Sequence, residues 1–367
     1  MEVYEKYGLN KVINASGKMT ILGVSKVRPS VFEAQQIGGE NFFEMSDLLE
    51  KTGDYLAKLL KSESATITSS ASAGIALSVA ALIGQGDEYH LYHPYTDRMT
   101  KREIIMPKGH NVNYGTGVDV MVEQGGGKVI EAGFANECTP KQIEIEITEK
   151  TAALLYIKSH HTVQKSMLSI EEMVAIAKKY DLPLIIDAAA EEDLFKYIEA
   201  GADLVVYSGG KAIEGPSSGL VVGKKEYIRW IQLQNKGLGR SMKVGKDNIL
   251  GLVAAIESYL ADGSESGDSM KERLAPFVSQ LNKINGLTSQ VVQDPAGRDI
   301  FRAEIKIDHK EKTALEVVKD LKVGPLAIYT RDYQANNGKI EFDIRQVDES
   351  EMATIVSKLK KIVSEEK

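Results

Sequence analysis

This chain of 367 residues has a single cysteine, no long apolar run and no excess of positive charge. Its single cysteine, Cys138, excludes an internal disulfide framework and a cysteine-based metal cage, and is typical of the reducing cytoplasm. No apolar run approaches the roughly 20 residues that cross a bilayer. The first residues, MEVYEKYGLN, lack the apolar core of a signal peptide. We therefore expect a cytoplasmic protein with no membrane partner.

The charge balance argues against nucleic acid as the main partner. Lysine and arginine number 45 against 52 aspartates and glutamates, which gives a formal net charge of −7. Binding to a phosphate backbone needs the opposite balance, although a local basic patch remains compatible with this one. The length suits one large domain and one smaller domain.

Short apolar runs alternate with helical patterns over the first two thirds of the chain. Helices are predicted over 72–83, 169–180 and 191–199, and runs buried on both faces, such as those at 184–187 and 204–207, are typical of parallel strands. This alternation predicts an α/β fold with right-handed crossovers. The predicted strands are Ser64–Thr68, Tyr89–Tyr92, Ile104–Met106, Lys128–Ala132, Ala152–Ile157, Leu184–Asp187, Leu204–Tyr207 and 218–223.

The pattern changes near residue 245. Two predicted strands, 301–307 and 339–345, alternate in polarity, as strands with one wet face do. We therefore expect a large domain over 1–245 and a small α+β domain over 246–367. The helices expected in the second region are 247–261, 268–284, 312–320 and 349–364.

An aspartate and a lysine follow two neighbouring predicted strands. Asp187 ends the first strand, and Lys211 lies in Ser208-Gly209-Gly210-Lys211 after the second. Ligands of open α/β sheets bind at the carboxyl ends of strands. This pairing is what pyridoxal 5'-phosphate (PLP) needs, because a lysine amine forms its Schiff base and a carboxylate keeps its ring nitrogen protonated. The alternative is a helix-capping aspartate and a solvated loop lysine.

Small residues open the predicted helix that follows the predicted strand Ser64–Thr68. Ser70, Ala71, Ser72 and Ala73 leave backbone N–H groups available at a helix N-terminus, where an anion such as the cofactor phosphate binds. Ordinary capping by Ser70 or Ser72 is the alternative. Ser208 is a further candidate donor to the phosphate or to the lysine.

The sequence resembles the L-seryl-tRNA(Sec) selenium transferase family of fold-type I PLP enzymes. The resemblance covers almost the whole chain and is most specific around Lys211. It implies an aspartate-aminotransferase-like α/β fold, with a large, mainly parallel seven-stranded sheet domain and a smaller C-terminal α+β domain. The matching segments are INASG (13–17), REIIMPKGHNVNYGTG (102–117), VIEAG (129–133), AALLYIKSHHT (152–162), IIDAAA (185–190), GADLVVYSGGKAIEGPSSGLVVG (201–223), RSMKVGK (240–246) and EFDIRQV (341–347).

Within that family the chain is similar to the D-glucosaminate-6-phosphate ammonia-lyase branch. The transferases have an additional N-terminal tRNA-binding domain, whereas this chain begins almost directly at INASG. The resemblance implies α,β-elimination from a hydroxylated amino acid, with D-glucosaminate 6-phosphate as substrate and 2-keto-3-deoxy-6-phosphogluconate and ammonia as products. It also implies a homodimer or a higher homo-oligomer. The alternatives are selenium or sulfur transfer to seryl-tRNA, and a PLP-binding protein without turnover.

Histidines are candidates for the remaining roles near the cofactor. His110 is a candidate for stacking on the cofactor ring, with Tyr92 and Tyr114 as competitors, or else a polar turn residue. His160 and His161 end a predicted strand, where adjacent residues face opposite sides, so they are poorly placed to share a metal. One of the pair is a candidate acid or base, and we expect no metal site.

Arginines are the candidates for binding the substrate. The resemblance implies a small-domain arginine that holds the substrate carboxylate, and Arg345 is preferred over Arg331 because it lies in EFDIRQV. Arg102 and Arg240, each in a basic cluster, are candidates for a substrate phosphate. Surface ion pairs and solvated faces are the alternatives for all four.

Overall fold

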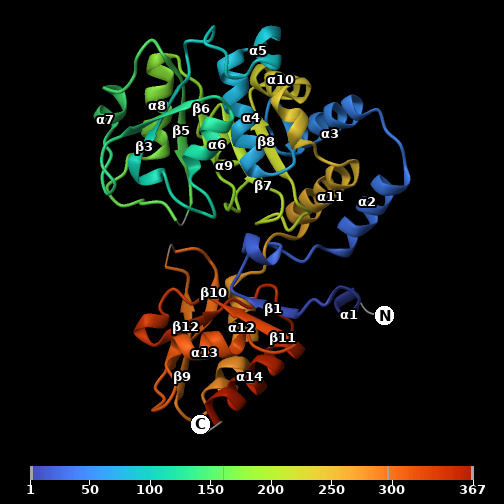
Figure 1. Ribbon diagram of the computed structural model, residues 1–367, viewed down its shortest axis with the longest axis vertical. Helices are drawn as coiled ribbons and strands as arrows, with labels where there is room; N and C mark the ends of the chain where they lie inside the picture. Colours follow the sequence, from blue (N-terminus) through green and yellow to red (C-terminus); the bar gives the residue numbers. More distant parts are fainter. Residues whose placement is uncertain (1–2, 160, 296, 365–367) are drawn as a thin grey trace. The chain divides into compact units, whose positions relative to one another are not determined.

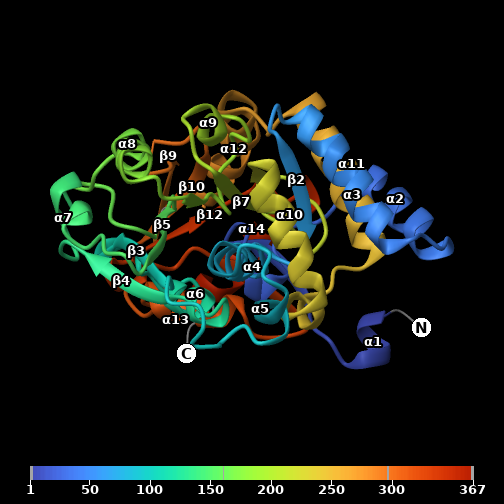
Figure 2. The ribbon, with the colours of Figure 1, turned by 90° about the horizontal axis from the view of Figure 1, so that it is seen from above.

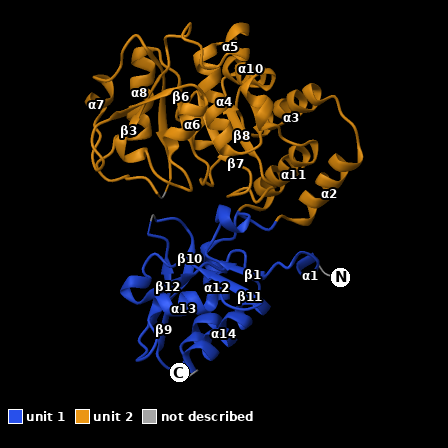
Figure 3. Ribbon diagram, in the orientation of Figure 1, with its two compact units in different colours: residues 1–26, 264–367 blue, residues 27–263 orange. Residues whose placement is uncertain are grey.

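The computed structural model describes residues 3–159, 161–295 and 297–364, and the chain forms two compact units (Figure 3). The larger unit comprises residues 27–263, and the smaller comprises 1–26 together with 264–367. This division differs from the predicted boundary after residue 245. Helix α11 (Lys246–Asp262) packs along α2 (Pro29–Glu40) and so belongs to the larger unit (Figure 2).

The larger unit is built on a seven-stranded sheet with the order β2-β8-β7-β6-β5-β3-β4 (Figure 1). The β7-β6-β5-β3-β4 pairs are parallel, and β8 runs antiparallel to both β7 and β2. This arrangement confirms the predicted fold. The strands are β2 (Ser64–Thr68), β3 (Glu103–Pro107), β4 (Lys128–Ala132), β5 (Thr151–Ile157), β6 (Leu184–Asp187), β7 (Leu204–Ser208) and β8 (Gly219–Gly223).

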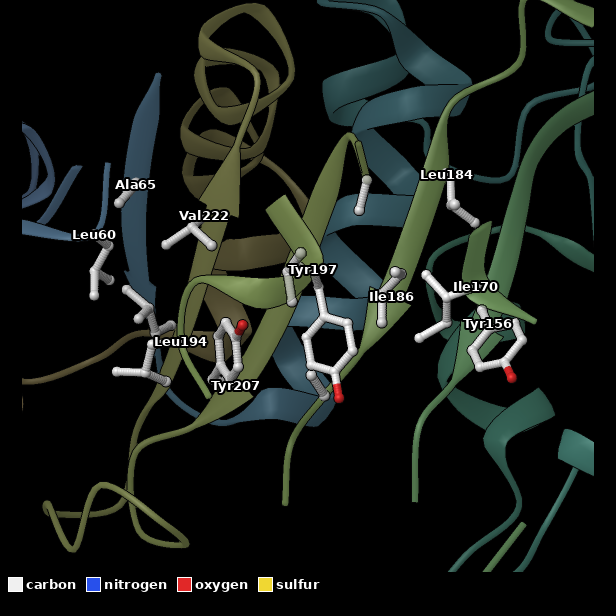
Figure 4. Close-up of a cluster of buried hydrophobic side chains, with 14 of the residues drawn as sticks. Leu60, Ala65, Tyr156, Ile170, Leu184, Ile186, Leu194, Tyr197, Tyr207 and Val222 are labelled. Atoms are coloured by element: carbon white, nitrogen blue, oxygen red, sulfur yellow. The ribbon is translucent and has the colours of Figure 1, made fainter. Parts of the chain in front are cut away.

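Helices cover both faces of this sheet, which is why its central strands are apolar throughout. One face packs against α4 (Ala71–Gly84), α6 (Val118–Gln124) and α10 (Lys225–Leu233). The other face forms a second buried cluster, in which Tyr156, Ile186 and Tyr207 come from neighbouring strands (Figure 4). The helices on that face are α2, α3 (Met45–Leu59), α7 (Pro140–Glu144), α8 (Ile170–Tyr180), α9 (Lys196–Glu199) and α11.

Two predicted elements of the larger unit differ from the structure. The strand predicted over Tyr89–Tyr92 is helix α5 (Glu88–Tyr92), which begins where the Asp87 carboxylate accepts the His90 N–H at 2.7 Å. The helix predicted over 191–199 is reduced to α9. The preceding turn is held by tyrosines instead, since Tyr207 and Tyr259 donate to carbonyls of this turn at 3.1 and 2.6 Å.

The smaller unit has a three-stranded antiparallel sheet, ordered β12-β10-β9, and a two-stranded parallel pair, β1-β11. The pairing of β1 with β11 explains why residues 1–26 join the C-terminal unit. Strand β12 ends at Phe342, earlier than predicted, because the Asp343 N–H turns to donate to the Ala15 carbonyl at 2.8 Å. The strands are β1 (Lys11–Ala15), β9 (Leu287–Gln293), β10 (Phe301–Ile307), β11 (Leu326–Thr330) and β12 (Lys339–Phe342).

Helices and short turns complete the molecule. No helix in the described part of the chain is both long enough and apolar enough to cross a membrane. The remaining helices are α1 (Val3–Tyr7), α12 (Gly267–Leu281), α13 (Ala314–Leu321) and α14 (Glu349–Ser364), and the 3₁₀ turns are η1 (Thr20–Leu22), η2 (Lys108–His110), η3 (Gln234–Lys236), η4 (Leu238–Met242) and η5 (Ala335–Asn337).

Candidate active site

Lys211 lies in a tight loop at the carboxyl end of β7. The Gly209 N–H donates to the Ser218 carbonyl at 2.9 Å, and the Gly215 N–H donates to the Gly209 carbonyl at 2.7 Å, so the loop closes on itself. A Cβ atom on Gly209 would lie 2.1 Å from the Ser218 Oγ, which explains the glycine. The half-buried lysine therefore projects from a fixed backbone.

Side chains from α2 and α11 support this loop from outside. The Asn248 Nδ2 donates to the Ser217 carbonyl at 3.1 Å, and the Gln35 Nε2 donates to the Asn248 Oδ1 at 3.1 Å. Glu214, with a φ of 56°, adopts a left-handed conformation, and its carboxylate lies 3.9 Å from the Arg28 Nε. The helix pair therefore fixes the loop that presents Lys211.

Asp187 ends β6, the strand beside β7, and its side chain is buried. Burial raises the pKa of the Asp187 carboxyl, against the opposing effects of the Ala189 N–H, which donates to Oδ1 at 3.0 Å, and of the Lys211 charge. Burial likewise lowers the pKa of the Lys211 amine, and Asp187 opposes that shift. The structure thus brings the two predicted residues together at one edge of the sheet.

The start of α4 meets this edge. Gly219 of β8 pairs with Thr68 on one side and with Ser208 on the other, so the strand before α4 and the strand before Lys211 end level with each other, on either side of β8. A Cβ atom on Gly219 would lie 2.4 Å from the Ser70 carbonyl oxygen, so the approach requires glycine.

Ser70 itself is the N-cap of α4. Its Oγ accepts the Ala73 N–H at 3.0 Å, which is the capping alternative raised by the sequence. The two interpretations are compatible, because the positive end of the helix dipole still favours an anion beside Ala71 and Ser72. A half-buried lysine, a buried carboxylate and a helix N-terminus on one edge together fit PLP.

Tyr114 is a site residue that the sequence indicated only as a competitor for ring stacking. Burial raises the pKa of its hydroxyl, the Ser72 side chain opposes that shift, and the negative charge of Asp187 adds to it. The buried Tyr114 hydroxyl has no hydrogen-bond partner among the described residues, and Ser72 and Asp187 both affect its pKa. The signal was an aromatic residue in a turn, which the structure shows as a bridge between Asn113 and Gly117.

His110 lies beside the carboxyl end of β5. It is fully buried, its Nδ1 accepts the Ile157 N–H at 3.4 Å, and its ring meets the Tyr156 ring edge-on with centroids 4.5 Å apart. Burial lowers the pKa of His110 to about 4, so the ring is neutral. These contacts place His110 beside Ile157, which pairs with Asp187 in the sheet, and its stacking on the cofactor ring remains a prediction.

The two histidines after β5 are only partly described. His160 lies outside the described residues. His161 is exposed in a turn rather than on a strand, because β5 ends at Ile157, and its N–H donates to the Ser159 Oγ at 3.2 Å. A catalytic role for either histidine remains a prediction.

Arg102 is a structural residue rather than a substrate ligand. Its guanidinium donates to the carbonyls of Met99 at 2.9 Å, Gly126 at 2.7 Å and Pro94 at 3.2 Å, and also to that of Thr96. It also precedes β3, at the amino end of a parallel strand, whereas Asp187 and Lys211 lie at carboxyl ends.

The second basic cluster differs from the first. Arg240 is exposed on η4, and Lys243 after it is also exposed. Lys246 is engaged, because its Nζ donates to the carbonyls of Gly38, Gly39 and Asn41. Arg240 therefore remains the better candidate for a substrate phosphate.

Arg331 and Arg345 both lie in the smaller unit among acidic partners. The Arg345 Nε and Nη2 donate to the two carboxylate oxygens of Asp343 at 2.9 and 2.8 Å, and 15% of the Arg345 side chain is exposed. The Arg331 Nε lies 3.4 Å from the Glu341 Oε2, and burial lowers the pKa of Arg331.

Other reactive groups contribute little. The described residues contain no group of three or more histidine, cysteine or acidic side chains that could hold a metal ion. Burial raises the pKa of the Cys138 thiol to about 11, so it stays protonated and unreactive at neutral pH.

Comparisons with known proteins agree with this geometry. The family model of L-seryl-tRNA selenium transferase matches residues 95–275. The chain is 44% identical over 362 residues to D-glucosaminate-6-phosphate ammonia lyase of Salmonella typhimurium (strain 14028s), covering 98% of this chain and 97% of that one. A 5'-C-glycyluridine monooxygenase-decarboxylase of Streptomyces is 32% identical over 365 residues, covering 98% of this chain and 92% of that one.

Solved structures give the same result. The structure of D-glucosaminate-6-phosphate ammonia-lyase matches with a TM-score of 0.93 at 44% identity, over 99% of this chain and 98% of that one. Aspartate aminotransferase of Thermotoga maritima matches with a TM-score of 0.54 at 14% identity, over 99% of this chain and 94% of that one, which shows a shared fold.

Proposed function

Because the chain belongs to the family of PLP enzymes that includes D-glucosaminate-6-phosphate ammonia lyase and L-seryl-tRNA selenium transferase, we propose that it is an ammonia lyase acting on D-glucosaminate 6-phosphate. The observation that supports this most strongly is the pair of the buried Asp187 and the half-buried Lys211, set in a chain 44% identical to a named lyase over nearly its full length.

The residues around this pair are suited to hold the cofactor. Lys211 would bind it through the amine, Asp187 would pair with the ring nitrogen, and the start of α4 with Ser72 would take the phosphate. Tyr114, whose pKa both Ser72 and Asp187 affect, would contact the ring. Bound PLP supplies an electron sink for the electrons released at the substrate α-carbon.

The lysine is suited to move protons at that carbon. Burial lowers the pKa of the Lys211 amine, so a larger fraction is neutral and able to accept the Cα proton near neutral pH. The β-hydroxyl then leaves as water with a proton from the same lysine or from a histidine of the pair 160–161. Loss of one water followed by addition of another gives 2-keto-3-deoxy-6-phosphogluconate and ammonia.

Two arginines are proposed to recognise the substrate. Arg345 would hold the carboxylate, since a guanidinium fork matches a carboxylate bidentately, with Arg331 as the second candidate. Arg240 would meet the 6-phosphate, because it is exposed and lies in the η4 turn. We also propose a homodimer or higher oligomer and a cytoplasmic location.

The test is a turnover assay on the purified, PLP-loaded protein. D-glucosaminate with and without the 6-phosphate is supplied, and ammonia and 2-keto acid are measured. We expect release from both compounds, with a much lower KM for the phosphorylated one. Turnover of neither compound, together with tight binding of seryl-tRNA, would replace this proposal with the transferase function. Tight PLP binding without any turnover of amino acids would indicate a non-catalytic protein.

A further inference from the structure

The smaller unit contains a buried network of arginines and carboxylates. Arg302 is fully buried, with its Nη1 2.9 Å from the Asp294 Oδ1 and its Nε 3.2 Å from the Asp343 Oδ2. Arg298 binds Asp294 from the other side at 2.9 Å. Burying so many charges is costly unless each is paired, so the network persists only with its geometry intact.

Asp343 is the member that connects this network to Arg345. Its two carboxylate oxygens accept both the Nε and the Nη2 of Arg345, while Oδ2 also faces Arg302. The Asp343 side chain is fully buried, whereas part of Arg345 is exposed. Burial works to raise the pKa of Asp343, but Arg345 and Arg302 outweigh it and hold the pKa well below its usual range.

The N-terminal turn 14–17 is fitted to the same contact. Gly17 has a φ of 93°, and a Cβ atom there would lie 3.1 Å from the Asp343 Oδ2 and 3.7 Å from the Arg345 Nη2. The turn is itself fixed, because the Asn14 Nδ2 donates to the Gly17 carbonyl at 2.8 Å and Asp343 is tied to Ala15 through its N–H. Backbone from one end of the chain thus packs over an ion pair from the other end.

We propose that Asp343, anchored by Arg302, is a positioning residue that fixes the guanidinium plane of Arg345 for the substrate carboxylate. This inference rests on the proposed function, in which Arg345 holds that carboxylate. A long arginine side chain loses considerable rotamer freedom when it binds a ligand in one orientation. Bidentate pairing with a buried carboxylate imposes that orientation before the ligand binds, so binding involves a smaller loss of side-chain entropy.

The test compares two inert probes on the PLP-loaded protein by calorimetry. D-gluconate 6-phosphate has the carboxylate but no amine, and D-glucitol 6-phosphate lacks the carboxylate as well. In Asp343→Asn we expect the affinity for the gluconate probe to fall about tenfold and that for the glucitol probe to stay within about twofold. In an Arg345→Lys background the same change should cost less than about twofold, because residues that act through each other are not additive.

Asp294→Asn is the matched control. It removes a buried carboxylate from the same network but leaves the contact between Asp343 and Arg345 in place. It should lower thermal stability while preserving the ratio of the two probe affinities. If Asp343→Asn does not fold, Gly17→Ala takes its place, since it keeps every charge and crowds the same oxygen; it should lower the affinity for the gluconate probe selectively.

The outcomes separate this inference from the proposed function. Equal weakening of both probes, or a full cost of Asp343→Asn without Arg345, would overturn the positioning role even if D-glucosaminate 6-phosphate is turned over. Failure of wild-type turnover with the selective probe pattern intact would overturn the substrate and leave the positioning role standing. Equal wild-type affinity for the two probes would mean that Arg345 holds no carboxylate, and the inference would fall.

Discussion

The two units bury charge in opposite ways. In the larger unit, burial moves both Asp187 and Lys211 toward their neutral forms, since it raises the pKa of the acid and lowers the pKa of the amine. In the smaller unit, Asp343 is equally buried, yet neighbouring arginines hold its pKa well below the usual range. A buried group with few partners can exchange a proton during a reaction, whereas a fully paired one is fixed in its charged form.

The comparison also shows where each unit gains or loses stability. Removing one partner of a buried ion pair leaves the other charge without a partner, which is strongly destabilising. Removing a charge that burial already disfavours releases a cost. The same substitution, aspartate to asparagine, should therefore act mainly on stability in the smaller unit and mainly on catalysis in the larger one.

The largest effect is expected for Lys211→Ala. Without the amine that binds the cofactor and accepts the Cα proton, ammonia release should fall by about 10⁴-fold or more. Borohydride reduction of the wild type followed by peptide mass analysis should place the cofactor label on Lys211. Labelling of another lysine would remove Lys211 from the site.

Asp187→Asn should reduce kcat by about 10² to 10³-fold, because it removes the preorganised charge that faces the cofactor ring nitrogen. Steady-state assays of ammonia release measure the loss, and the visible absorbance of the purified variant reports whether PLP is still bound. Near-normal kcat with bound PLP would place the ring-nitrogen partner on another residue.

Asp343→Asn should lower the free energy of unfolding by about 3 kcal/mol at pH 7. The pKa of Asp343 is held below its ordinary value of 3.8, so the stability it contributes is present above that pH and is lost as the pH falls further. Melting temperatures are measured by calorimetry from about pH 3 to 7, which covers the range where carboxylates titrate. As the pH falls, the melting temperature of the variant should decrease less steeply than that of wild type. An unchanged melting temperature at pH 7 would show that the pairing of Asp343 with Arg302 and Arg345 does not stabilise the fold.

Arg102→Ala and Arg240→Ala test whether an engaged guanidinium supports stability, as the charges of the smaller unit do, while an exposed one supports substrate binding. Arg240→Ala should raise KM for D-glucosaminate 6-phosphate by about tenfold with little change in kcat, because a remote uniform contact is lost. Arg102→Ala should lower the melting temperature instead, since it leaves several carbonyls without their donor. If Arg102→Ala selectively raises KM for the phosphorylated substrate, its structural assignment is wrong.

The smallest effect concerns the stability of cofactor-free Asp187→Asn. Burial raises the pKa of Asp187 above its ordinary 3.8, so its favourable contribution is complete below that pH and is lost as the pH rises through the folded pKa. The variant removes a carboxyl whose charged form burial disfavours, and it should melt at a slightly higher temperature than wild type at pH 7. The gap should shrink at acid pH, and a lower melting temperature at pH 7 would contradict the pKa direction.

The features that the sequence predicted correctly depend on local patterns. The runs at 184–187 and 204–207 are apolar because both faces of the sheet are covered, and that pattern placed Asp187 and Lys211 at neighbouring strand ends. The start of α4 was recognisable because small residues follow a predicted strand and open a predicted helix. Each of these features follows from the residues within its own segment, so the sequence alone could predict it.

Two predictions differ from the structure because contacts with backbone distant in the sequence determine the position of the residues concerned. The four carbonyls that engage Arg102 come from residues 94–99 and from Gly126, which no charge pattern reveals. The strand predicted over Tyr89–Tyr92 is a separate case, because the nearby cap at Asp87 begins a helix there. The first 26 residues were predicted with the large domain, whereas they group with the C-terminal residues because the partner of β1 is β11, near the other end of the chain.

The position of β8 between β7 and β2 has a consequence for the order in which the protein is made. In the described sheet β2 has one strand neighbour, β8, and their register joins Ser64 to Gly223. During synthesis, β2 emerges from the ribosome long before β8, the strand that joins it to the sheet. A nascent chain that stops before Gly219 has Asp187 and Lys211 already translated, but β2 still lacks its strand partner, so we expect the proposed cofactor site to be completed only after this late pairing.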